Sequence, residues 1–174
     1  MKKILAIIPA RGGSKGIPNK NIKKINGKPL IHYTIVQAKK SKYISKIVVS
    51  SDDEKILSYS KKSKVDVIKR PKKLSTGTAR SEDVYKHVIQ HYDKLNQFFD
   101  TIVILQPTSP LRIKNDIDNA INKFRKSNSD MVLSVYPAPF PPEWYFLIKN
   151  RKLKFFINKK KVKRRQDYDR FYIP

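Results

Sequence analysis

A segment near the start of the chain combines glycines with basic residues, "ARGGSKGIPNKN" at residues 10–21. Three of the chain's five glycines and three cations lie in it: Gly12, Gly13, Gly16, Arg11, Lys15 and Lys20. Glycine has no Cβ, so successive backbone N–H groups can turn toward one anion, and the cations add full charges around it. The segment predicts a polyphosphate site, with a glycine-rich turn carrying solvated lysines as the alternative. It matches neither G-x-x-x-x-G-K-[ST] nor G-x-G-x-x-G, which disfavours the two common nucleotide-binding folds.

The segment "LQPTSPLR" at residues 105–112 presents a polar side chain from a stiff loop. Two prolines restrict the backbone that follows Gln106, whose amide can both donate hydrogen bonds to hydroxyl groups and accept them. This chemistry suits a sugar better than a phosphate. For Thr108, Ser109 and Arg112 we favour structural roles as caps of the loop and of the next helix.

Two pairs of side chains have spacings that could suggest a metal site. His87 and His91 lie four residues apart on a predicted helix, but no acidic or third ligand accompanies them, so an exposed helix face is favoured. Asp52 and Asp53 follow a predicted strand, and we favour capping of the next helix over metal binding. The sequence assigns no metal ligands.

The segments at residues 8–24 and 105–112 together resemble the acylneuraminate cytidylyltransferases, also called CMP-sialic acid synthetases. Residues 47–56 and 70–84 agree with that family at its spacing. The resemblance implies a nucleotidyltransferase that joins CMP from CTP to the anomeric hydroxyl of a nonulosonic acid, sialic acid or a relative, and releases pyrophosphate. In such a reaction, catalysis is chiefly alignment and neutralisation of phosphate charge.

The resemblance also implies roles for individual residues. Arg11 and Lys15 would be catalytic, acting on the phosphates as a planar fork and a mobile point charge. The nucleotide would be bound by Arg11, Gly12, Gly13, Ser14, Lys15, Lys20, Asn21, Arg70, Ala79 and Ser81. The sugar would be bound by Gln106, Arg165 and Gln166. A surface cation is the alternative for Arg70.

Mg²⁺ is the cofactor that the resemblance implies. Members of the family bind it with an aspartate pair that lies beyond the segment corresponding to "RRQDYDRFYIP". We therefore expect either a fragment or a shortened protein, which retains some CTP binding but has little or no synthetase activity. Neither of the two main segments contains Asp or Glu.

Short apolar runs that alternate with amphipathic segments predict the scaffold. We expect strands at residues 3–8, 45–51, 65–69, 101–107 and 130–136, and helices at residues 29–41, 53–63, 81–95 and 114–126. This alternation predicts one α/β domain over residues 1–136, a three-layer, mostly parallel, Rossmann-like sheet with helices on both faces. Ligands of such sheets bind at the carboxyl ends of the strands, where residues 10–21 must lie.

Residues 137–174 predict a separate arm. A proline-rich connector, "PAPFPPEW", precedes "WYFLIKNRKLKFFI", which is typical of two strands joined by a turn at Asn150. Such an apolar surface needs cover, which predicts a homodimer. The family resemblance points the same way and implies that Arg165 and Gln166 approach the neighbouring subunit's sugar site.

Composition narrows the class of protein. The net charge of +25, from 39 basic and 14 acidic residues, suggests either a nucleic-acid partner or a lysine-rich solvated surface. The charge is spread along the whole chain, which favours the second. The absence of cysteine and of any apolar run near 18 residues leads us to expect a cytoplasmic protein without a membrane partner. The cytidylyltransferase is thus the preferred function; a Kdo-type cytidylyltransferase and a basic nucleic-acid-binding protein are the alternatives.

Overall fold

The computed structural model describes residues 2–14, 16–157 and 168–174. The chain forms two compact units, Met1–Asn122 and Lys123–Pro174. The predicted boundary between residues 136 and 137 falls inside the second unit. No helix among the described residues has the length and apolar character that crossing a membrane requires.

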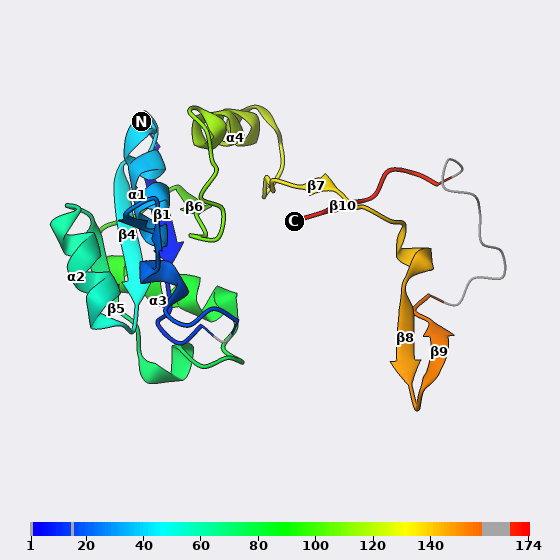
Figure 1. The fold of residues 1–174 in the computed structure, drawn as a ribbon. Helices are drawn as coiled ribbons and strands as arrows, with labels where there is room; N and C mark the ends of the chain where they lie inside the picture. The colour runs from blue at the N-terminus through cyan, green and yellow to red at the C-terminus, as the bar shows by residue number, and fades with distance from the viewer. Residues whose placement is uncertain (1, 15, 158–167) are drawn as a thin grey trace. The chain divides into compact units, whose positions relative to one another are not determined.

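Four parallel strands form the centre of the first unit, in the order β5-β4-β1-β6 (Figure 1). They are β1 (Ile4–Pro9), β4 (Lys46–Ser51), β5 (Asp66–Lys69) and β6 (Thr101–Ile104). Strand β1 pairs with β4 on one side and with β6 on the other. A parallel strand in this position is buried on both faces, which explains its unbroken aliphatic sequence.

Helices cover both faces of this sheet. Ile4, Ala6 and Ile8 of β1 pack with buried residues of α1 (Leu30–Lys40), α2 (Glu54–Lys62) and α4 (Asp116–Lys126). The alternate residues, Leu5 and Ile7, pack with α3 (Ser81–Asp93). Successive side chains of a strand point to opposite faces, so one run of sequence supplies two cores. The predicted three-layer α/β fold is confirmed.

A small hairpin after the glycine-rich segment was not predicted. Strands β2 (Lys24–Ile25) and β3 (Lys28–Pro29) pair antiparallel around Asn26 and Gly27, both of which have positive φ. Asn-Gly is the strongest local signal for such a turn, so this hairpin was readable from the sequence. Two short 3₁₀ helices also belong to this unit, η1 (Lys20–Ile22) and η2 (Lys72–Leu74).

The second unit contains the predicted hairpin. Strands β8 (Phe146–Lys149) and β9 (Lys152–Phe155) pair antiparallel, with Asn150 and Arg151 at positive φ in the turn. A 3₁₀ helix, η3 (Pro142–Trp144), precedes them, and β7 (Tyr136–Pro137) pairs with β10 (Tyr172–Ile173).

The predicted strand at residues 130–136 is wrong except for its last residue. Tyr136 lies in β7, whereas residues 130–135 have no strand partner among the described residues, and Met131, Leu133 and Val135 are exposed. Alternating apolar residues give a segment β propensity, but a strand also needs a neighbour for its backbone hydrogen bonds.

Candidate nucleotide-binding site

A cavity of about 310 Å³ lies at the carboxyl ends of the strands in the first unit. The loops after β1, β5 and β6 and the first turns of α3 line it. The chain runs from β1 to β4 and β5 on one side and then returns to place β6 on the other, so the strand order reverses at β1. Open α/β sheets bind ligands at such a reversal.

Most of the predicted site residues line this one cavity. They are Arg11, Ser14, Lys20, Asn21, Arg70, Ala79, Ser81 and Gln106. Gly12 and Gly13 belong to the same loop without lining the cavity. Lys15, Arg165 and Gln166 lie outside the described residues.

Sequence reasoning missed Val84 and Tyr85, which also line the cavity. Tyr85 lies four residues after Ser81 in α3. Residues at this spacing share one face of a helix, so both side chains lie on the face that lines the cavity. That signal was present in the sequence.

The peptide group between Arg11 and Gly12 is held from two sides. Its carbonyl oxygen accepts a hydrogen bond from the Asn21 side-chain amide at 2.9 Å, and its N–H donates to Asp52 Oδ1 at 3.0 Å. Asn21 is only 5% exposed, which fits this structural role. The Arg11 guanidinium in turn donates to the carbonyl of Thr76 at 3.1 Å, so it reaches across to the loop after β5.

The glycine-rich loop is therefore not a fully open nest of amides. The Gly12 N–H is bound to Asp52, and the Ser14 N–H donates to the Gly12 carbonyl at 2.9 Å. The prediction of consecutive N–H groups awaiting an anion fails at these two positions. The positive charge of the loop comes from its side chains.

Asp52 and Asp53 have different roles, although capping of the next helix was predicted for both. Asp53 caps α2, with Oδ1 accepting from the N–H groups of Lys55 at 2.8 Å and Ile56 at 3.0 Å. Capping is confirmed for Asp53. For Asp52 the prediction of capping is wrong, because its carboxylate accepts a hydrogen bond from Gly12 in the loop after β1.

Arg70 is buried, with 6% of its surface exposed, so the alternative of a surface cation is wrong. Its Nε donates to Ser50 Oγ at 3.2 Å and its Nη2 to the Ser50 carbonyl at 2.8 Å. Burial lowers the pKa of the guanidinium, and the nearby Asp52 carboxylate opposes that shift. The result is a cation fixed in direction at the cavity wall.

Arg112 holds the loop that presents Gln106. Its guanidinium donates to the carbonyls of Ser109 at 2.9 Å and Gln106 at 3.0 Å, and to Thr34 Oγ1 at 3.3 Å. This agrees with the structural role predicted for Arg112. The Gln106 side chain itself stays exposed at the cavity.

The described residues contain no group of three His, Cys, Asp or Glu side chains that could hold a metal ion. His91 is exposed, but His87 is half-buried, so the predicted exposed face is wrong for His87. It adjoins the buried stripe of α3, Val84, Val88 and Tyr92. Burial lowers the pKa of His87, with neighbouring positive charges adding to the shift.

A cavity at the reversal of a parallel sheet is typical of a ligand-binding site in an α/β protein, and its arginine, lysine and amide side chains suit an anionic ligand. The family model described as Cytidylyltransferase matches residues 5–170, so the chain belongs to the cytidylyltransferase family. The resemblance seen in the sequence is thereby confirmed.

Two curated relatives illustrate this relationship, and one solved structure shares the fold. The chain is 37% identical over 173 residues to the pseudaminic acid cytidylyltransferase of Campylobacter jejuni, covering 98% of this chain and 74% of that protein. It is 34% identical over 175 residues to an N-acylneuraminate cytidylyltransferase of Streptococcus agalactiae, covering 99% of this chain and 41% of the relative. CMP:2-keto-3-deoxy-manno-octonic acid synthetase, solved in complex with CTP, has a TM-score of 0.61 at 24% identity, over 76% of this chain and 50% of that one.

Proposed function

We propose that this chain binds CTP in the cavity of the first unit and transfers CMP to a nonulosonic acid. The observation that carries the proposal is that residues implied by family resemblance, 95 positions apart in the chain at Arg11 and Gln106, line a single cavity. The names of the relatives, which act on pseudaminic acid and N-acylneuraminate, support this substrate class. The Kdo-type alternative is less well supported, because that likeness is one of fold alone.

The residues of the cavity suit this transfer. Arg11, Lys20 and Arg70 would neutralise the triphosphate, and Gln106 would orient the sugar through hydrogen bonds to hydroxyl groups. The anomeric hydroxyl oxygen would bond to the α-phosphorus while the bond to the bridging oxygen breaks. Pyrophosphate would leave with that electron pair, and the hydroxyl proton would pass to water.

Mg²⁺ would accompany the triphosphate and screen its charge. Magnesium commonly keeps several waters and binds one or two carboxylates together with substrate phosphates. The carboxylates nearest the glycine-rich loop, Asp52 and Asp53, both accept backbone hydrogen bonds. The donor set at this edge therefore suits a nucleotide-bound Mg²⁺ better than a cage built by the protein.

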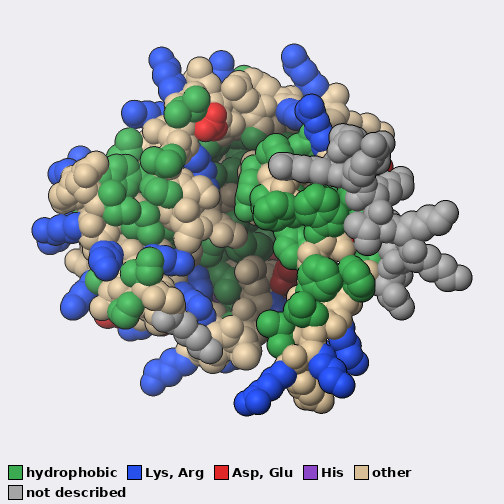
Figure 2. Space-filling model, turned by 45° about the vertical axis from the view of Figure 1, so that its right-hand side comes forward, with side chains coloured by type: hydrophobic (Ala, Val, Ile, Leu, Met, Phe, Trp, Pro, Cys, Tyr) green, Lys and Arg blue, Asp and Glu red, His purple; other side chains and the backbone are tan. Residues whose placement is uncertain are grey.

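The test is pyrophosphate release with CTP, ATP or GTP and a panel of nonulosonic acids, alongside calorimetric titration of each nucleotide. We expect CTP to bind and to support slow release by this chain, and ATP and GTP to do neither. A nucleic-acid-binding protein would instead ignore the identity of the nucleotide and lose affinity steeply as salt rises. On the face shown in Figure 2, the basic side chains are dispersed and do not gather into one patch.

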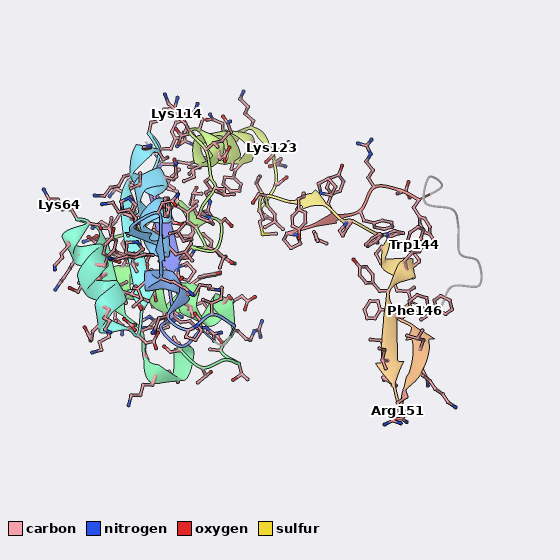
Figure 3. All side chains as sticks on the ribbon, in the orientation of Figure 1. Lys64, Lys114, Lys123, Trp144, Phe146 and Arg151 are labelled. Carbon is pink, nitrogen blue, oxygen red and sulfur yellow. The ribbon has the colours of Figure 1, made fainter. Side chains whose placement is uncertain are left out.

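We also propose that the second unit makes the protein a homodimer. Every residue of β8 and β9 is exposed, and the hairpin carries Phe146, Ile148, Leu153 and Phe155 at 49%, 76%, 68% and 51% exposure. Phe146 lies at the base of the hairpin and Arg151 at its tip (Figure 3). An apolar surface of this kind on a small unit is typical of an interface.

Light scattering at micromolar concentration should show a dimer, and Ile148→Glu should shift it to monomer because a buried carboxylate would be unpaired at the interface. Lys152→Glu places the same residue at a polar position of the same hairpin and should leave the dimer intact. A monomeric parent protein would refute the proposal.

A further inference from the structure

The end of β4 supports both cationic walls of the cavity. The Ser50 carbonyl accepts from the Ala10 N–H at 2.9 Å and from the Arg70 guanidinium at 2.8 Å. The Ser51 carbonyl accepts from the Arg70 N–H at 2.7 Å. Two strands that flank β4 therefore end in loops whose directions are set by the same residues, and these loops carry Arg11 and Arg70.

Asp52 continues this support into the glycine-rich loop. Its Oδ1 accepts from the Gly12 N–H, while the Asn21 amide binds the carbonyl of the same Arg11–Gly12 peptide group. A peptide group bound at both its oxygen and its N–H cannot rotate without losing a hydrogen bond. The clamp therefore fixes the backbone from which the Arg11 side chain extends, and the Thr76 carbonyl accepts a hydrogen bond from the guanidinium at the other end of that side chain.

The charge of Asp52 acts in two opposite ways. It favours the charged form of Arg70, and it repels the triphosphate that the cavity is proposed to bind. What the site gains is a hydrogen-bond acceptor in a fixed place. The packing agrees, because a Cβ added to Gly12 would lie 2.8 Å from Asp53 Cβ, which shows how closely the loop sits on this turn.

We infer that Asp52 is a positioning residue of the CTP site, which orients Arg11 by clamping the Arg11–Gly12 peptide and acts through its acceptor oxygen rather than its charge. The inference rests on the proposed function for its ligand. Nothing in the local sequence marks Asp52 for this role, since Asp53 beside it is the helix cap.

The experiment compares Asp52→Ala and Asp52→Asn with Asp93→Ala, a control that removes an exposed carboxylate at the end of α3. Asp52→Ala should weaken CTP binding about tenfold or more in calorimetry, the scale of a lost hydrogen bond to a charged acceptor. Asp52→Asn should restore affinity to within about twofold of the parent, because its amide oxygen accepts the same hydrogen bond. Asp93→Ala should match the parent.

Amide hydrogen exchange at Gly12 supplies a readout that needs no nucleotide. Exchange should be faster in Asp52→Ala than in the parent and slow again in Asp52→Asn. Equal CTP affinity in the parent and Asp52→Ala, or unchanged exchange at Gly12, would overturn the inference. Failure of Asp52→Asn to rescue, with an altered Mg²⁺ dependence, would also overturn it and indicate a metal ligand. A parent protein that does not bind CTP at all would refute the proposed function instead.

Discussion

Gly12→Ala should weaken CTP binding by about tenfold or more, whereas Gly13→Ala should leave it within about twofold of the parent. The two glycines are adjacent, and neither has the positive φ that would itself exclude a side chain. The two positions differ in the room that is available for a Cβ atom. A Cβ at Gly12 would lie 2.8 Å from Asp53 Cβ and 2.9 Å from Asp53 Oδ2, while nothing lies within 4 Å of a Cβ at Gly13.

The contact at Gly12 is with the first atom of a capping side chain. Asp53 cannot move aside without giving up its hydrogen bonds to the first turn of α2, so the loop must shift and the Arg11–Gly12 clamp must open. Calorimetry with CTP and urea unfolding should be measured on both variants. Equal CTP affinities for Gly12→Ala and Gly13→Ala would mean that the loop rearranges on binding and that its packing in this state is irrelevant.

The scaffold was largely predictable from the sequence because its signals are local. The β1 strand is an aliphatic run that ends at Pro9, and the helices show apolar residues at helical spacing. Once the strand order is expected, the carboxyl ends of the strands mark the ligand side. The prediction at residues 130–136 failed where a local pattern was not enough, since a strand depends on a partner distant in the sequence.

The clamp and the burial of Arg70 were not predictable for the same reason. Asp52 and Gly12 are 40 residues apart, and Arg70 bonds to Ser50 across 20 residues. A sequence in which an arginine stands between a strand and a proline is typical of a surface turn, so it gave no sign that Arg70 is buried. Its burial follows from a carbonyl and a hydroxyl that a neighbouring strand presents, and no periodicity encodes that pairing.

Replacing Arg70 by lysine should show how much of the site depends on a forked, fixed cation. The charge is kept, but lysine cannot donate to Ser50 Oγ and to the Ser50 carbonyl in the geometry of the guanidinium. We expect Arg70→Lys to lower the free energy of unfolding by about 1–3 kcal/mol. CTP affinity should fall by about tenfold, because the ammonium can no longer be held at the cavity wall.

The pH dependence of CTP affinity should distinguish arginine from lysine at position 70. Burial lowers the pKa of Arg70, yet arginine begins so high that it stays charged throughout the physiological range. Lysine begins at about 10.4, and the same burial would lower its pKa further. The CTP affinity of Arg70→Lys should therefore decline between about pH 7 and pH 9 as the ammonium loses its proton, while the parent's stays flat. The control is Arg151→Lys, at an exposed arginine in the turn of the β8–β9 hairpin, which should change neither stability nor affinity. An Arg70→Lys variant with the stability, affinity and flat pH profile of the parent would show that Arg70 acts only as a charge.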